Sequence, residues 1–184
     1  SPEEAVTWPL PRQREAWNAV CRAFAAPIPE GLEIDDLEAT RPDGGRVPFR
    51  LYRPVGARDV PITLYFHGGG WVLGGIATHG DMCAELAARS RTAVALVDYR
   101  LAPEHPHPAQ FEDNVAVWSA LKNGLAEERG LDASRIVAAG DSAGGQMSAS
   151  LALSLRDAGL PMLAGLVLIY PALGVDLETP SYIR

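Results

Sequence analysis

The sequence is poor in cysteine, with only Cys21 and Cys83 among its 184 residues. Two cysteines in helix-like apolar segments do not form a disulfide framework, so both are expected to be buried free thiols. Basic residues are also in the minority, because 16 Lys and Arg face 23 Asp and Glu and leave a net charge of −7. Without any basic run, this balance excludes a typical nucleic-acid partner.

Long apolar runs are missing as well. The longest, MLAGLVLIYPAL, is well short of the roughly 20 residues that span a bilayer, and Pro171 interrupts it. The opening stretch SPEEAVTWPL lacks the basic and apolar regions of a secretion signal. These absences predict a soluble, cytoplasmic protein with no stable membrane anchor.

What is present is an alternation of strand-like and helix-like segments. Residues 11–26 have the spacing of an amphipathic helix, and residues 47–51 alternate as a strand does. Further strand-like runs at 62–66, 92–99, 134–140 and 163–171 alternate with helix-like segments at 78–90, 108–130 and 142–159. This order predicts an α/β fold, with a mostly parallel central sheet and flanking helices.

A serine motif, Gly140-Asp141-Ser142-Ala143-Gly144, lies between one such strand and one such helix. In a sharp strand-to-helix turn, side chains two positions either side of the central residue would collide, and glycine removes that collision. The turn would expose the Ser142 hydroxyl at a helix N-terminus, with the Ala143 amide available to an oxyanion. The alternative is an ordinary turn with a serine N-cap.

A second glycine-rich segment, YFHGGGWVLGG, follows the strand at 62–66. The consecutive glycines Gly68, Gly69 and Gly70 let the backbone approach a ligand with its amides exposed, as an oxyanion hole requires. A phosphate loop would need a lysine that is absent here, and a dinucleotide fingerprint would open directly into a helix. Trp71 either lines a substrate pocket or covers the core.

Three motifs, HGGGW (67–71), DYRLAPEHPHPA (98–109) and GDSAGG (140–145), together resemble the hormone-sensitive-lipase-like, or bacterial type IV, carboxylesterases of the α/β-hydrolase fold. The motifs stand in that family's order, and the resemblance extends over about residues 43–182. It implies hydrolysis of short- to medium-chain carboxylic esters, which are small-molecule substrates, without a cofactor.

The resemblance also implies an architecture and roles. Residues 43–184 would form a three-layer αβα hydrolase core, and the N-terminal helical segment, residues 1–42, would be part of a cap. Ser142 would form an acyl-enzyme, and the oxyanion would lie against the amides of Gly68, Gly69, Gly70 and Ala143.

Polar residues near these motifs are expected to support them. His67 would brace the glycine loop by bonding backbone rather than act as a base. Asp141 points away from Ser142 on a tight turn, so it would be a brace rather than the triad acid. Asp98, Arg100 and Glu104 are expected to form an ion-pair cluster. His105 and His107 alternate with Pro106 and Pro108 in an extended segment, and no Cys, Asp or Glu stands at ligand spacing within a rigid element, so no metal site is predicted.

A complete triad in this fold has its acid and then its histidine after the serine. The residues after Ser142 include Asp157, Asp176 and Glu178 but no histidine. We therefore expect the acid and base to come from a portion absent from this chain, with the C-terminal part of the fold missing.

Two alternatives stay open: a non-catalytic small-molecule-binding module or inactive fragment on a hydrolase scaffold, and a short variant that uses His67, His79 or a neighbouring subunit. A sheet that ends at residues 163–171 would expose an apolar edge. We therefore expect self-association into a homo-oligomer, or binding of a complementing C-terminal fragment.

Overall fold

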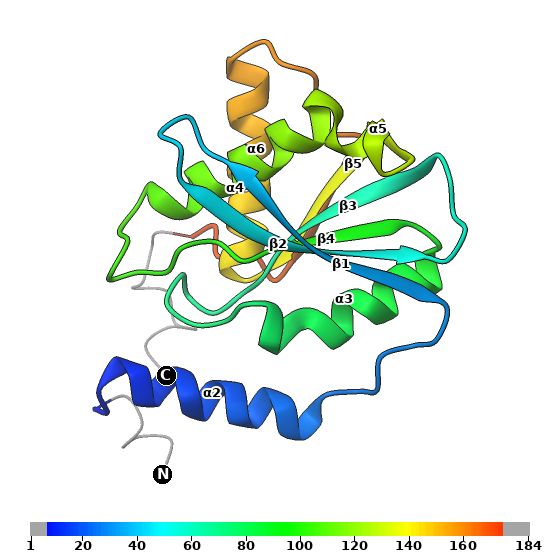
Figure 1. Ribbon diagram of the computed structural model, residues 1–184. Coiled ribbons are helices and arrows are strands. Elements are labelled where there is room, and N and C mark those ends of the chain that lie inside the picture. Colours follow the sequence, from blue (N-terminus) through cyan, green and yellow to red (C-terminus); the bar gives the residue numbers. More distant parts are fainter. Residues whose placement is uncertain (1–6, 175–184) are drawn as a thin grey trace.

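The computed structural model describes residues 7–174, which fold around one six-stranded sheet (Figure 1). The strands are β1 (Leu32–Thr40), β2 (Arg46–Pro54), β3 (Val60–Phe66), β4 (Ala93–Val97), β5 (Leu131–Asp141) and β6 (Gly165–Ile169). Their order in the sheet is β1-β2-β4-β3-β5-β6. β2 pairs antiparallel with β1 and β4, whereas β4, β3, β5 and β6 run parallel. The mostly parallel sheet predicted from the sequence is confirmed.

Helices cover both faces of this sheet. The helices on the sheet are α3 (Ile76–Ser90), α4 (Ala109–Ala120), the short α5 (Ala126–Glu128) and α6 (Ala143–Asp157), whereas α2 (Leu10–Phe24) packs on α3. α3 packs on one face, where its Cys83 and Ala87 meet Tyr65 and Leu96. α4 and α6 pack on the other face, as Figure 1 shows. The arrangement is the three-layer αβα fold that was predicted.

The apolar character of the central strands follows from this coverage. All five residues of β4 are buried, because a parallel strand with helices on both sides has no solvent-facing side. In β3, Leu64 and Phe66 face α4 and α6 while Tyr65 faces α3. The carboxyl ends of β3 and β5 lie side by side, since Phe66 pairs with Gly140. The glycine loop and the serine motif therefore begin at the same edge of the sheet.

The structure departs from expectation in the N-terminal segment, residues 1–42. Its helical part is α2, but Leu32–Thr40 form β1, which pairs with β2 along its whole length. Acidic side chains are unfavourable in strands, yet here Asp36 and Glu38 are paired with arginines of β2. The division of the chain into a cap and a core stays a prediction.

Two smaller expectations also need correction. The helix expected over residues 108–130 is broken after α4, because Asn123 and Gly124 leave the helical region and Gly124 has a φ of 122°. Cys83 is a buried free thiol, as expected, but Cys21 is only partly buried, because α2 buries none of its residues. Burial raises the pKa of the Cys83 thiol well above its usual value.

The outer strand β6 carries the expected apolar side chains. Leu166, Val167 and Ile169 are 42%, 50% and 38% exposed. Within residues 7–174, no helix has both the length and the apolar character needed to cross a bilayer. Asp176 and Glu178, named above as acids that follow the serine, lie outside the described residues.

Candidate active site

Ser142 occupies a sharp turn between β5 and α6. Its backbone has φ 51° and ψ −116°, a conformation that residues with a Cβ rarely adopt. The turn is held on both sides, because the Ser142 amide donates to the Ile169 carbonyl at 2.9 Å and the Ser142 carbonyl accepts from the amides of Gln146 and Ala172. The strand, turn and helix predicted around this serine are confirmed.

The glycines on either side of the turn stand where other backbone comes very close. A Cβ added to Gly144 would lie 1.8 Å from the Phe66 carbonyl oxygen, and one added to Gly140 would lie 2.4 Å from the Gly144 carbonyl carbon. Both contacts are with main chain, which cannot move aside as a flexible side chain would. The collision inferred from sequence is therefore present, and the end of β3 is one of its partners.

Asp141 reaches from the serine turn to the glycine loop. Its Oδ1 accepts hydrogen bonds from the Gly68 amide at 3.0 Å and the Tyr65 hydroxyl at 2.9 Å, and it lies 3.5 Å from Nε2 of His79. Burial raises the pKa of this carboxyl, but His79, Tyr65 and the Gly68 amide outweigh burial and hold the pKa below its usual value. Asp141 therefore links the serine turn to Tyr65 and to the glycine loop, which agrees with a bracing role. Because the Gly68 amide is bound to Asp141, that amide is not free to bind a ligand.

The remaining amides of the glycine loop are oriented by a tight turn. The Gly69 carbonyl accepts from the amides of Val72 at 3.1 Å and Leu73 at 2.9 Å. Because the N–H and C=O of a trans peptide point in opposite directions, the Gly70 N–H points away from this turn. Within the described residues, the amides of Gly69, Gly70 and Ala143 donate to no acceptor of the protein. Three backbone donors thus remain free at the edge of the sheet where Ser142 lies.

His67 is fully buried beneath the glycine loop. Its Nδ1 donates to the Gly68 carbonyl at 2.8 Å, and its ring stacks on Tyr99 at 4.0 Å between centroids. The Tyr99 hydroxyl donates to the His67 carbonyl at 2.7 Å. Burial lowers the pKa of His67 to about 4. These contacts agree with the expected brace, and a neutral, buried imidazole of this kind is a weak base.

His79, the other histidine named as an alternative base, is also engaged. Its Nε2 faces Asp141, and its Nδ1 lies 2.8 Å from the Thr78 hydroxyl. Among residues 7–174, neither histidine ring hydrogen-bonds Ser142. Residues 7–174 also hold no group of three or more His, Cys, Asp or Glu side chains placed to bind a metal.

Burial of neutral His67 makes stability depend on pH. Its pKa of about 4 in the folded protein is below the value near 6.5 of an unfolded chain, so the unfolded chain binds the proton first as pH falls. We expect the free energy of unfolding to drop by about 3 kcal/mol between pH 6.5 and 4 from this residue. Urea denaturation at several pH values measures the drop.

The matched comparison is His67→Gln against His105→Gln. His105 is exposed in the loop between β4 and α4 (residues 98–108, called the DYRLAPE loop below), so its replacement should leave the pH slope unchanged. His67→Gln should flatten the slope over the same range. Equal slopes in both variants would assign the pH dependence to other groups.

A cavity of about 580 Å³ opens beside the glycine loop. Gly70 and Trp71 form part of its wall, so the expectation that Trp71 lines a pocket agrees with its position. The remaining lining residues come from the 102–111 segment and from α6; they are Ala102, His107, Pro108, Gln110, Phe111, Gln146, Met147, Ser150 and Ser154. The sequence analysis did not predict that side chains of α6 line the cavity. The signal was present, because Gln146, Ser150 and Ser154 recur at the four-residue interval of one helix face.

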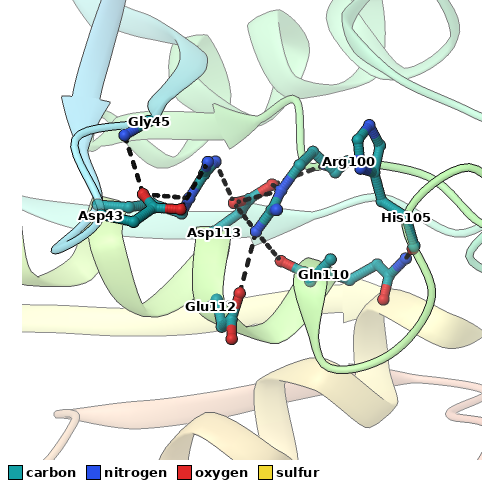
Figure 2. A network of polar contacts seen from close by, with 9 residues as sticks. Asp43, Gly45, Arg100, His105, Gln110, Glu112 and Asp113 are labelled. Carbon is teal, nitrogen blue, oxygen red and sulfur yellow. Dashed lines mark hydrogen bonds and ion pairs between the residues drawn. The ribbon is translucent and has the colours of Figure 1, made fainter.

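The ion-pair cluster expected among Asp98, Arg100 and Glu104 is not formed. Figure 2 shows Arg100 between Asp113, whose carboxylate it meets at 2.9 Å, and Glu112 at 3.1 Å. Glu104 pairs with Arg14, and Asp98 accepts the amide of Ile76. The three residues are neighbours in sequence, but the loop turns between them and directs each to a different element.

Asp113 is the centre of the network that holds this loop. Asp113 is 1% exposed and also forms an ion pair with Arg41 at 3.1 Å, so two arginines share one buried carboxylate. Its partner Arg100 precedes the cavity-lining segment, and its own helix α4 begins within the last residues of that segment. Asp113 therefore closes the ends of the loop that forms one wall of the cavity.

Comparison with known proteins places this geometry in a family. Residues 63–183 match the profile of a family described as having the alpha/beta hydrolase fold. Carboxylesterase NlhH of Mycobacterium tuberculosis is 47% identical over 139 residues, which are 74% of this chain and 43% of the relative. Ethyl acetate hydrolase of Pseudomonas putida is 38% identical over 159 residues, 82% of this chain and 48% of the relative.

Solved structures agree with the sequence relatives. Ester-hydrolase EH1AB1 from the metagenome of Lake Arreo, solved with a bipyridine phosphonate derivative, superposes with a TM-score of 0.90 at 40% identity, covering 97% of this chain and 57% of that one. An esterase of Pyrobaculum calidifontis superposes with a TM-score of 0.82 at 34% identity, covering 96% and 60%. The chain thus spans about half the length of the curated relatives that it matches. It belongs to the hormone-sensitive-lipase-like family of the α/β-hydrolase fold.

Proposed function

We propose that this chain supplies the nucleophile and the oxyanion hole of a carboxylic ester hydrolase. The observation that carries the proposal is the combination of Ser142 at a positive φ with three unoccupied backbone amides at the same sheet edge. A strained strand-to-helix turn of this kind presents a serine hydroxyl to substrate, and free amides stabilise the charge that develops on the attacked carbonyl.

In the proposed reaction, the Ser142 hydroxyl attacks the ester carbonyl and a general base accepts its proton. The tetrahedral oxyanion lies against the amides of Gly69, Gly70 and Ala143, each of which contributes up to about 10²–10³ in rate. Collapse of this intermediate releases the alcohol and leaves an acyl-enzyme on Ser142, which water then hydrolyses. In this fold the acid and the histidine follow the serine along the chain, and all four histidines precede Ser142, so the base and its acid are assigned to a portion outside residues 7–174.

This assignment narrows the four amides expected from sequence to three. Gly68 shapes the loop, because its amide is bound to Asp141 and a Cβ there would lie 2.1 Å from the Asp141 Oδ2. The cavity beside Gly70 is the proposed substrate pocket, and its volume suits short- to medium-chain esters. The relative named ethyl acetate hydrolase supports the short end of that range.

Labelling with a fluorophosphonate probe tests the proposal. Such a probe phosphonylates a serine only when that serine is activated, so we expect one adduct on the native protein that includes the portion supplying the base and acid, and none after heat denaturation. Peptide mapping by mass spectrometry should place the adduct on Ser142. An adduct on another residue would refute the assigned nucleophile. Ester binding without any adduct would favour a small-molecule-binding module on a hydrolase scaffold.

A further inference from the structure

The N-terminal helix α2 is attached to the rest of the structure in an unusual way. None of its fifteen residues is buried, and Trp17, Val20 and Phe24 are 40%, 52% and 86% exposed. Figure 1 shows α2 on the far side of α3 from the sheet. Apolar packing therefore contributes little to its position, and polar contacts at defined points must hold it.

One side chain of α2, that of Arg14, makes most of these contacts. Its Nε donates to the Val72 carbonyl at 2.9 Å, and its Nη2 donates to the Ala102 carbonyl at 2.9 Å. Nη1 and Nη2 also bind the two carboxylate oxygens of Glu104, each at 2.8 Å. A single guanidinium thus joins the cap-like helix to the glycine loop and to the DYRLAPE loop.

The two carbonyls that Arg14 binds belong to segments that shape the candidate site. Val72 closes the turn on the Gly69 carbonyl, and that turn sets the direction of the Gly70 N–H. Ala102 lines the cavity, and its amide donates to the Trp71 carbonyl at 2.9 Å. Arg14 therefore donates hydrogen bonds to both segments, the glycine loop at Val72 and the cavity wall at Ala102, close to where the two segments meet.

The partners of Arg14 are not equivalent. Glu104 is 50% exposed, and an ion pair in such a position contributes little to stability because water screens it. Its bidentate contact mainly fixes the plane of the guanidinium. The bonds to the two carbonyls need donors in several directions within one plane, a geometry that arginine has and lysine lacks.

We propose that Arg14 is a positioning residue that holds the glycine loop, and with it the Gly70 amide, in the orientation for transition-state stabilisation. The helix α2 acts on the site through this side chain. The effect of Arg14 on turnover rests on the function proposed above, whereas its effect on the loop does not.

Hydrogen–deuterium exchange tests the effect on the loop directly. In Arg14→Ala, the amides of Val72 and Leu73 should exchange about tenfold faster, as expected for the loss of roughly one hydrogen bond's contribution. Arg22→Ala is the matched control, because Arg22 is an exposed arginine of the same helix whose side chain forms no hydrogen bond or ion pair with residues 7–174. Amides of β4 and β5 should exchange at the wild-type rate in both variants.

Steady-state kinetics, normalised to sites titrated with fluorophosphonate, test the effect on turnover. Arg14→Ala should lower kcat about tenfold and leave KM within about twofold, because oxyanion contacts form in the transition state. Arg14→Lys should recover only part of this loss, and Glu104→Gln should lower kcat by less than about threefold. A raised KM with unchanged kcat would overturn the positioning role.

The two measurements separate the two proposals. If the wild-type protein hydrolyses no ester, the proposed function fails, and exchange at Val72 and Leu73 still decides whether Arg14 holds the loop. If those amides exchange equally in wild type, Arg14→Ala and Arg22→Ala, the inference is wrong whatever the activity.

Discussion

Replacing Ser142 with alanine is expected to lower kcat for ester hydrolysis by about 10⁴–10⁶-fold, the loss seen when a catalytic serine is removed. The fold should persist, because alanine and serine tolerate the positive φ of this turn about equally and the backbone hydrogen bonds to Ile169 and Ala172 remain. Hydrolysis of a 4-nitrophenyl ester and thermal denaturation of the same samples measure both quantities.

Ser150→Ala is the control for this experiment. Ser150 lies on the same helix and lines the cavity, where its hydroxyl receives a hydrogen bond from Gln146 at 2.8 Å. Its replacement removes the same atom from the wall of the proposed pocket and leaves the proposed nucleophile in place, so any loss of activity should be at most about tenfold, far smaller than in Ser142→Ala. Near-normal activity in Ser142→Ala would instead place the nucleophile elsewhere.

Replacing Gly144 with alanine is expected to destabilise the fold strongly. The added Cβ would lie 1.8 Å from the Phe66 carbonyl oxygen and 2.9 Å from the His67 carbonyl oxygen, so α6 and the end of β3 must separate. We expect a loss of about 3 kcal/mol or more in the free energy of unfolding. Since a typical domain has about 5–15 kcal/mol in total, soluble yield should fall as well. Urea denaturation of the recovered protein measures the loss.

Gly165→Ala separates the steric effect from the general effect of replacing a glycine. A Cβ at Gly165 in β6 would meet only Val137, at an ordinary 3.7 Å. Its unfolding free energy should therefore change by less than about 1 kcal/mol. If the two variants proved equally stable, the close approach of β3 to the serine turn would not limit the residue at position 144.

The serine turn could be predicted because its geometry restricts residue type. Gly140 and Gly144 are required by the closeness of neighbouring main chain, and the flanking segments have clear strand and helix patterns. The three-layer fold was predictable for a similar reason, since a strand covered on both faces, such as β4, reads as a continuous apolar run.

The strand β1 could not be predicted with the same means. LEIDDLEAT contains four acidic residues, which are uncommon in strands. They are tolerated because arginines from elsewhere reach them, as Arg50 reaches Asp36 and Arg129 reaches Asp35. Those partners are separated in sequence from the strand they support, so local pattern carries no sign of them.

The roles of individual backbone amides and of long side chains could not be predicted from the sequence either. Nothing in the residue type distinguishes the Gly68 amide, which binds Asp141, from those of Gly69 and Gly70, which remain free. Arg14 looks in sequence like any polar residue of an amphipathic helix. Its role follows from where its guanidinium ends, and that depends on how α2 lies across two distant loops.

Under the proposed function, the positive φ of Ser142 sets stability and function against each other at one residue. A non-glycine residue held in such a conformation costs about 1–3 kcal/mol, whereas glycine would adopt it freely. Selection for stability alone would thus favour glycine at position 142, and only selection for a hydroxyl would retain serine. In a lineage that had lost the activity, we therefore expect replacement of serine by glycine at position 142 to be among the first changes.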